Sequence, residues 1–522
     1  MTDDRSEANI QFFSYFLVDE SLYNARPDLM LSGRTVIGHT SAKDQQLEDH
    51  YFGAIPSRVS SFMKDFETEA YKLGILLQTR HNEVAPNQFE CAPLYCEATK
   101  AIDQNMMLMI IMQKVAEKHH LKVIFHEKPF DGVNGSGKHC NWSIMTDTGI
   151  NLLSPGKTPT KNLSFLSFYA AVLRAMYRHH FLMMTSVASL SNSYRLGGNE
   201  APPAVMSVFS GSTLYRVFQS IMKMKDLKES SSSQESITIV NSIPEIFPDN
   251  TDRNRTSPFA FTGNRFEFRA VGSSQNVASA VYVINTVVAE SLNEFRDEVD
   301  ALEASGVERS EAVMNTVRKF VTDAKDIMFE GNGYSKEWEI ESEKRGLRAV
   351  KNVPESYEVY HEQQTLDLFS KLGILAPNEV EARFEILNET YVKKLQIEAR
   401  IIGDMCLNHV IPAAVRYQNV LIENVKGMKE IFGDLHAELC VAEIETLKKI
   451  STYINSISAD VEALVEERKT ANRIENIAER AKVYSHNVKD MMEKVRDSAD
   501  HLEMLVDDEM WPLPKYRELL FF

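Results

Sequence analysis

The chain has 522 residues, of which 43% are hydrophobic, 25% charged and 9% aromatic. These fractions are those of globular proteins, so they exclude a wholly disordered chain, a collagen-like repeat and a low-complexity protein. Lys and Arg number 57 against 74 Asp and Glu, which gives a formal net charge of −17. This charge argues against binding to nucleic acid or to an anionic membrane surface by bulk electrostatics.

Five cysteines without a CxxC pair fit a reducing compartment better than a disulfide framework or a zinc site. The longest apolar run, 106–112, ends at Gln113 and Lys114. It is far shorter than the ~20 residues that a membrane-spanning helix needs. The acidic, polar start has no apolar segment of the kind found in signal peptides, so the sequence predicts a cytoplasmic protein without a membrane span.

Residues 1–275 mix short apolar runs with Gly, Pro and Asn, which predicts a region of mixed α and β structure. Helices are expected from Ala98 to His119 and from Phe165 to Thr185. Short apolar runs lie at 121–130 (LKVIFHEKPF) and at 265–272 (RFEFRAVG), and the period-two alternation of the second run indicates a half-buried strand. The Ser-rich stretch KESSSSQES at 228–236 has the composition of an exposed loop or small insertion.

Residues 276–427 are predicted to be almost wholly helical, with breaks at GNGYSKEW (331–338) and APNEVE (376–381). Residues 428–522 form a third unit. Its first eighty residues lack proline and carry apolar positions at three-four spacing, which predicts a helical hairpin or bundle packed outside the rest. Assembly or support is the expected role, and docking of a dedicated partner helix is the less favoured alternative.

Two polar clusters in the first region are candidates for ligand binding. In RHNEVAPNQFE (80–90), Glu83 and Glu90 flank a proline, so a turn can return both to one face to share a hard divalent cation. Taken alone, two surface glutamates beside a loop are the commoner case. In FDGVNGSGKHCNWS (130–143), the segment from Asn134 through Gly135 can bring backbone N–H groups close to an anion, and His139 follows. Most such turns only connect strands, and this one does not match the phosphate-binding loop pattern.

Two further clusters carry arginine and glutamate. SNSYRLGGNEAPP (191–203) places Arg195 and Glu200 in a Gly-rich stretch that ends in two prolines, as a mobile loop does. TDRNRTSPFAFTGNRFEFR (251–269) contains Arg255, and strand alternation puts Glu267 and Arg269 on one face with Arg265. Such a face is either a plain ion-pair network or the charge arrangement that stabilises a transferring phosphoryl group.

Together, HNEVAPNQFE, NGSGKH, NEAPP, NRTSPFAFTGNRFEFR, NHVIPAAVRYQ and WPLPKYRELLF resemble the glutamine synthetase family in its long type III form. The resemblance runs from about Tyr15 to the last residue, in order and without a large gap. It implies an α+β catalytic fold, with a curved, mostly antiparallel sheet and flanking helices, followed by a largely helical C-terminal region. It also implies ATP, glutamate and ammonia as substrates, Mg²⁺ or Mn²⁺ as metal, and a ring-type homo-oligomer such as a dodecamer.

The resemblance also implies a role for each residue at a matching position. The metal ligands would be Glu83 and Glu90 for the ion nearer glutamate, and His139 and Glu267 for the ion nearer the nucleotide. The residues that bind glutamate would be Asn134, Gly135, Arg195 and Arg269. Arg255 would contact the γ-phosphate and Ser143 would lie near the nucleotide. Glu200 would be the flap carboxylate that shields the acyl phosphate from water and accepts a proton from ammonium.

Two departures from the family pattern affect the expected activity. The family's first catalytic strand reads Gly-x-Glu-x-Glu before an aromatic run and supplies one carboxylate to each metal, whereas this chain has Phe12 and Ser14 before Tyr15. The β-grasp domain, which contributes an aspartate that helps to deprotonate ammonium, is also expected ahead of this region and does not precede Met1. Nucleotide binding is expected to survive both departures, but turnover by the chain as it stands is not.

Three functional hypotheses follow. The first is an ATP-dependent glutamate–ammonia ligase, or a truncated form of one. The second is a catalytically inactive paralogue with a structural or regulatory role. The third is a sensor that binds a nucleotide or an amino acid. The intact site residues favour the first, and the residues at positions 12 and 14 motivate the others.

Overall fold

The computed structural model describes residues 5–198, 201–223 and 256–521. Within these residues a nine-stranded sheet has the order β2-β3-β1-β6-β9-β8-β7, and β4 and β5 also pair with β1. The strands are β1 (Arg5–Asp19), β2 (Leu77–Asn82), β3 (Gln88–Pro93), β4 (Cys96–Glu97), β5 (Leu121–Ile124), β6 (Gly137–Met145), β7 (Val208–Phe209), β8 (Phe259–Phe261) and β9 (Phe266–Gly272). Apart from the parallel pair β7 and β8, the described strands pair antiparallel. The predicted α+β fold with a mostly antiparallel sheet is confirmed.

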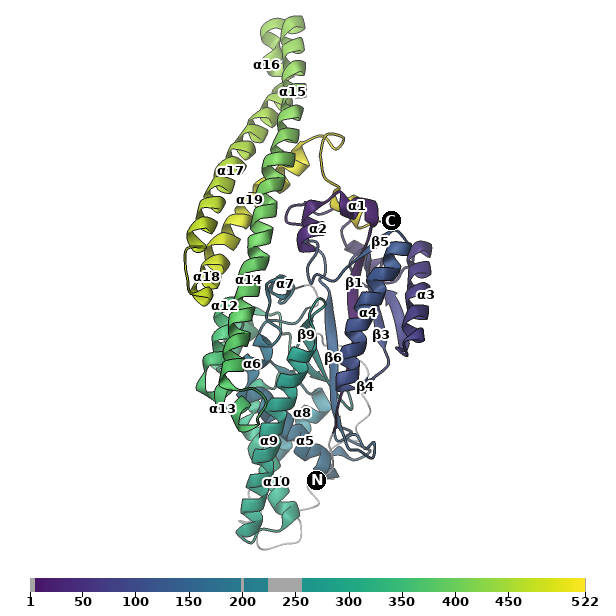
Figure 1. The fold of residues 1–522 in the computed structure, drawn as a ribbon, viewed down its shortest axis with the longest axis vertical. Helices are drawn as coiled ribbons and strands as arrows, with labels where there is room; N and C mark the ends of the chain where they lie inside the picture. The colour runs from purple at the N-terminus through teal and green to yellow at the C-terminus, as the bar shows by residue number, and fades with distance from the viewer. Residues whose placement is uncertain (1–4, 199–200, 224–255, 522) are drawn as a thin grey trace.

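Helices of the first region cover this sheet (Figure 1). They are α1 (Glu20–Asn24), α2 (Pro27–Ser32), α3 (Ser57–Lys72), α4 (Ala98–Lys118), α5 (Leu163–Arg178), α6 (His180–Thr185), α7 (Leu190–Ser193) and α8 (Ser212–Lys223). The predicted helix from Ala98 is confirmed as α4, which packs against β1. It starts where the Glu97 carboxylate accepts the N–H groups of Thr99 and Lys100, as a helix cap does.

The predicted helix over 165–185 is present as two helices, α5 and α6, with a break at His179. The His179 ring is buried, and its Nε2 lies 2.7 Å from the carboxylate of Glu290. A tertiary contact of this kind is not visible in local periodicity. In the apolar run at 121–130, Leu121–Ile124 forms the strand β5.

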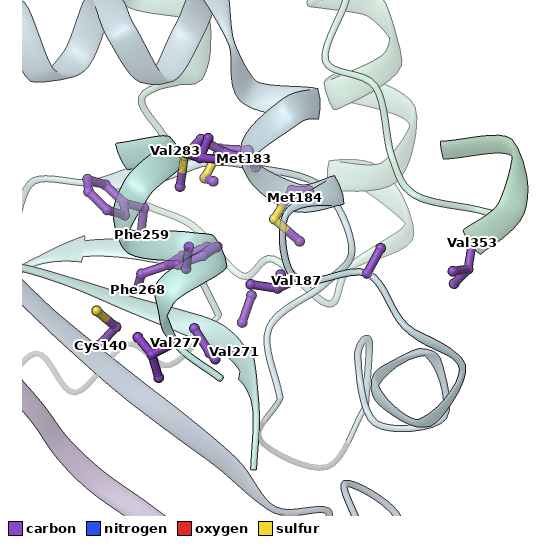
Figure 2. Close-up of a cluster of buried hydrophobic side chains, with 14 of the residues drawn as sticks. Cys140, Met183, Met184, Val187, Phe259, Phe268, Val271, Val277, Val283 and Val353 are labelled. Carbon is purple, nitrogen blue, oxygen red and sulfur yellow. The ribbon is translucent and has the colours of Figure 1, made fainter. Parts of the chain in front are cut away.

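The expected half-burial of the strand at 265–272 is wrong, because all seven residues of β9 are buried. One of its faces belongs to the main hydrophobic core, which it shares with helices from elsewhere in the chain. Figure 2 shows this core around Cys140, Met183, Met184, Phe259, Phe268, Val271, Val277 and Val283. The other face carries Glu267 and Arg269, which are buried by polar contacts rather than exposed to water. Alternation in the sequence therefore marks two buried faces of different chemistry.

From residue 278 onward the described elements are helices, as predicted, and they begin close to the expected boundary at 276. The longer ones are α9 (Ala278–Ala304), α10 (Arg309–Asp323), α11 (Lys336–Lys344), α13 (Gln363–Lys371), α14 (Pro377–Met405), α15 (Ile411–Phe432), α17 (Val441–Ala471), α18 (Ile477–Val483) and α19 (Lys489–Leu505). The shorter ones are α12 (Val353–Ser356), α16 (His436–Leu439) and α20 (Tyr516–Leu519). The predicted breaks are present, since α11 is capped by Ser335 and α14 begins at Pro377.

The C-terminal helices form the predicted hairpin, and Figure 1 shows α15 and α16 at its end, extending well beyond the sheet. Helix α17 contacts both α15 and α19. Position 428 lies inside α15, which continues to Phe432. Helix α19 is anchored to the first region, because Asp500 accepts the N–H of Gly38 (2.6 Å) and Glu503 that of His39 (3.1 Å). The C-terminal helices are therefore attached to the first region through α19.

No helix among the described residues is both long enough and apolar enough to cross a bilayer.

Candidate active site

The hairpin of β2 and β3 brings the two predicted glutamates together. Its turn is closed by hydrogen bonds from the Glu83 N–H to the Gln88 carbonyl (2.9 Å) and from the Gln88 N–H to the Ala85 carbonyl (3.1 Å). Within the ladder, His81 lies directly opposite Glu90. Residues directly opposite each other across two strands present their side chains on the same face. The return of Glu83 and Glu90 to one face, predicted from the proline between them, is therefore observed.

His81, Glu83 and Glu90 form a compact group of possible metal ligands. His81 Nε2 lies 3.0 Å from a Glu90 carboxylate oxygen and 3.5 Å from one of Glu83. One ligand atom from each residue lies within 4.8 Å of the others. Both glutamates are buried, and hydrogen bonds to them raise the pKa of His81 to about 9. Burial, with Glu83 nearby, raises the pKa of Glu90 although the two histidines oppose it. Protonated His81 therefore balances part of the charge of the two carboxylates in this structure.

Strand β1 crosses this group at the two positions where the family pattern fails. Ser14 lies opposite Glu90, and its hydroxyl donates to a Glu90 carboxylate oxygen at 3.3 Å. Position 12 lies opposite His139 in the ladder of β1 and β6. Each substitution therefore stands beside one of the two predicted pairs of metal ligands.

The second pair of predicted ligands lies on β6 and β9. His139 Nδ1 is 2.6 Å from one carboxylate oxygen of Glu267, and the other accepts a hydrogen bond from Arg269 at 3.1 Å. Although burial opposes it, His139 and Arg269 hold the pKa of Glu267 well below its usual range. Glu267 and Arg269 share a face, as strand alternation predicted. Because Glu90 also experiences the charge of His139, the two pairs lie in one electrostatic environment.

Two of the predicted glutamate-binding residues, Asn134 and Gly135, belong to a network of amides. Gln45 bonds to the N–H and the side-chain oxygen of Asn134 (2.9 and 3.0 Å). Gln88 donates to the Gly135 carbonyl at 3.0 Å. These contacts hold the loop that precedes β6. Its conformation is therefore set by Gln88, at the start of β3, and by Gln45, which follows α2 in the chain.

Arg195 follows α7 and is buried against β9. Its guanidinium donates to the carbonyls of Arg269 (3.1 Å) and Val271 (3.3 Å), and burial lowers its pKa to about 10. A Cβ at position 137 would lie 2.1 Å from Arg195 Nη2, so a larger residue there would displace the guanidinium. In this structure the guanidinium therefore holds the backbone of β9.

Ser143 is buried on β6, and its hydroxyl donates to Asn151 (2.9 Å) and to the Asn264 carbonyl (3.2 Å). Glu200 and Arg255, the predicted flap carboxylate and γ-phosphate contact, lie outside the described residues, as does the Ser-rich stretch at 228–236.

The donor set fits divalent cations. Carboxylate oxygens suit Mg²⁺ and Mn²⁺, and imidazole nitrogen suits Mn²⁺ and later transition metals. One group supplies two carboxylates and an imidazole, and the pair on β6 and β9 supplies one of each. Buried carboxylates held this close to one another need a compensating positive charge, which a cation supplies.

Comparison with known proteins gives the same result. Residues 11–220 match the glutamine synthetase catalytic domain, and residues 312–429 match the glutamine synthetase C-terminal domain. The chain is 50% identical over 511 residues to a glutamine synthetase of Bacteroides fragilis, with 97% of this chain and 70% of that protein covered. It belongs to the glutamine synthetase family.

Two other relatives are also glutamine synthetases, and one of them is of type 3. The chain is 41% identical to the type-3 glutamine synthetase of Dictyostelium discoideum, and the match covers 97% of this chain and 69% of that protein. It is 40% identical to a glutamine synthetase of Butyrivibrio fibrisolvens, covering 97% of this chain and 71% of that protein. The family and type predicted from the motifs are confirmed, and with them the ligase class. Membership of this family implies the use of ATP and a divalent metal.

Three residues of the site were not predicted: His81, Gln45 and Gln88. His81 is part of the first motif, and a register for the hairpin that paired it with Glu90 would have identified it. Gln88 lies in the same motif. Gln45 carried no signal, because it reaches Asn134 from a part of the chain 89 positions away.

Proposed function

We propose that this chain carries the site of a ligase that joins ammonia to the γ-carboxylate of glutamate at the expense of ATP, through a γ-glutamyl phosphate, in nitrogen assimilation, and that turnover at this site needs a carboxylate at positions 12 and 14. The observation that carries the proposal is that Glu83 and Glu90 lie in one group and His139 and Glu267 in another, on either side of β1, in a chain 40 to 50% identical to glutamine synthetases. The γ-carboxylate is an unreactive acyl group, so it must be phosphorylated before ammonia attacks.

In the proposed site, Glu83 and Glu90 hold one cation and His139 with Glu267 hold the other, either Mg²⁺ or Mn²⁺. When bound, the cations offset the charge that develops as the γ-phosphoryl group is transferred. Arg255 contacts that group, and Ser143 lies at the nucleotide end. Asn134, Gly135, Arg195 and Arg269 bind glutamate, with Arg195 acting through the backbone of β9 as well.

Glu200 is proposed as the carboxylate that closes over the acyl phosphate and accepts a proton from ammonium. A closing group is needed because water competes with ammonia for the activated carbonyl. The Gly-rich sequence around position 200 is suited to such a movement.

The product tests the reaction. With ¹⁵N-ammonium, glutamate, ATP and a divalent cation, a variant with glutamate at positions 12 and 14 is expected to place the label in the side-chain amide of glutamine, and aspartate in place of glutamate is expected to give none. The assay is run on the unmodified chain and on a variant with glutamate at positions 12 and 14. Phosphate release without labelled amide in either protein would contradict the ligase assignment.

Glu267→Gln is expected to weaken binding of ATP, measured by calorimetry with Mn²⁺, by about tenfold or more. The amide removes the charge that pairs with His139 and Arg269 and supplies a poorer metal ligand. Glu69→Gln, an exposed glutamate on α3 paired only with Lys72, is the control and is expected to leave binding unchanged. If the unmodified protein, Glu267→Gln and Glu69→Gln bound ATP with equal affinity, Glu267 would not be a ligand of the metal nearer the nucleotide.

The chain is also proposed to form a ring-type homo-oligomer in the cytoplasm. The compartment is supported by five cysteines, which are all free. Assembly is supported by the end of the helical hairpin, where apolar side chains are exposed on Ile431 (74%), Leu435 (57%), Leu439 (53%) and Val441 (56%). Exposed apolar groups gathered in one place are typical of an interface.

Replacing these four residues with serine is expected to lower the oligomeric mass in light scattering and to leave the thermal unfolding midpoint nearly unchanged. The side chains are already exposed, so their removal costs little within one chain. The control replaces Ile340 and Ile386, which are similarly exposed on α11 and α14. Unchanged mass in the fourfold variant would contradict a role of this hairpin end in assembly.

A further inference from the structure

We propose that His81 is a direct nitrogen ligand of the cation held by Glu83 and Glu90, on the side of the site where β1 supplies a serine instead of a carboxylate. The inference deepens the proposed function and rests on it. Binding of the ion displaces the proton from His81 Nε2 to solvent, and the freed lone pair forms the bond to the metal. The ion then has two carboxylates and one imidazole, and so a different metal preference from a site of carboxylates alone.

The hairpin geometry puts the imidazole in position. His81 is opposite Glu90 in the ladder, and its Nε2 lies 3.0 Å from Glu90 and 3.5 Å from Glu83. Ligand atoms at about 2.0 to 2.2 Å from one ion lie about 3 Å from their neighbours, so these separations match adjacent ligands around one cation. The three ligand atoms also lie within 4.8 Å of one another.

The opposite side of the group cannot supply an equivalent donor. Ser14 is the residue of β1 that faces Glu90, and its hydroxyl is neutral and donates to the Glu90 carboxylate at 3.3 Å. A neutral hydroxyl is a much weaker ligand than a carboxylate. Three positions flank Glu90: Ser14 on β1, His81 on β2 and Glu83 in the turn. Of these three, His81 and Glu83 bring a strong donor to Glu90.

A neighbouring ring restrains the imidazole. Tyr51 packs edge-on to His81, with ring centroids 6.2 Å apart and planes at 87°. A ligand whose ring is held by its surroundings loses less entropy on binding a metal. The side chain is about one-third exposed, so a cation can reach it from solvent.

The chemistry of this donor set favours Mn²⁺ over Mg²⁺. Mg²⁺ prefers oxygen ligands, whereas imidazole nitrogen adds affinity for transition metals. We therefore expect His81→Gln to weaken Mn²⁺ binding by about tenfold or more while weakening Mg²⁺ binding by less than about threefold.

The decisive experiment uses Mn²⁺ alone and detects a directly bound nitrogen by electron spin echo envelope modulation. It is done in a His139→Gln background, which removes the other imidazole of the site. Coupling to one imidazole ¹⁴N is expected there, and its loss is expected when His81→Gln is added. His436→Gln, at a half-exposed histidine on α16, is the matched control and should keep the coupling.

Two results would overturn the proposal in distinguishable ways. If Mn²⁺ binds and Glu90→Gln weakens it, but the His139→Gln protein shows no ¹⁴N coupling, His81 is not a ligand while the metal site proposed above stands. If Glu90→Gln leaves Mn²⁺ affinity unchanged, the metal site and the role of His81 fail together.

Discussion

Restoring glutamate at positions 12 and 14 is expected to raise the rate of glutamine formation by about a thousandfold or more. Ser14 faces Glu90, and position 12 lies opposite His139, so the two substitutions give one carboxylate to each proposed cation site. Charge stabilisation of this kind contributes several kcal/mol to a phosphoryl-transfer barrier. The unmodified chain, which lacks both carboxylates, is expected to form no measurable γ-glutamyl product.

The matched control is Phe12→Gln with Ser14→Gln. Glutamine has nearly the same shape as glutamate but carries no charge. This control should show no gain. The chain spans about 70% of the length of its Bacteroides relative. Both double variants are therefore also assayed as fusions that carry the N-terminal region of that relative ahead of this chain. Robust glutamine formation by the unmodified chain would show that the family's carboxylates at these positions are dispensable here.

The sequence predicted the residues of this site better than their contacts. Glu83 and Glu90 were predicted to meet because a proline-containing turn separates them, and they do. The partnership of His81 with Glu90 depends on the register of the hairpin, and a shift by one residue would have turned His81 away. The motif alone does not fix that register.

Burial was predicted less well than secondary structure, because burial depends on distant elements. RFEFRAVG was correctly predicted as a strand, but its polar face is covered by contacts from α7 and β6 rather than by water. Similarly, three-four spacing predicted the C-terminal helices, yet nothing in that spacing indicated that Asp500 and Glu503 bond to the backbone near residue 38. Such contacts are set by the tertiary fold.

The largest expected loss of stability comes from a buried ion pair that joins α14 to the first region. Arg34 Nε lies 3.0 Å from a Glu398 carboxylate oxygen, and the two side chains are only 6% and 4% exposed. The same oxygen accepts the hydroxyl of Tyr194 at 3.2 Å, and the Arg34 guanidinium lies 4.1 Å from the centre of the Tyr194 ring. Glu398 thus compensates one buried charge and holds the residue that precedes Arg195.

Glu398→Ala is therefore expected to lower the free energy of unfolding by about 3 to 5 kcal/mol, because it leaves Arg34 buried without a counter-charge. The measurement is the shift of the urea midpoint. Glu389→Ala is the control on the same helix: its partner Lys393 is exposed, so a change of about 0.5 kcal/mol or less is expected.

Since Tyr194 precedes Arg195, and Arg195 bonds to the backbone of Arg269, the Michaelis constant of Glu398→Ala for glutamate should rise more than that for ATP. That comparison is made in the protein with glutamate at positions 12 and 14. Equal destabilisation by the two alanine substitutions would contradict the buried pair, and equal rises of the two Michaelis constants would limit Glu398 to stability.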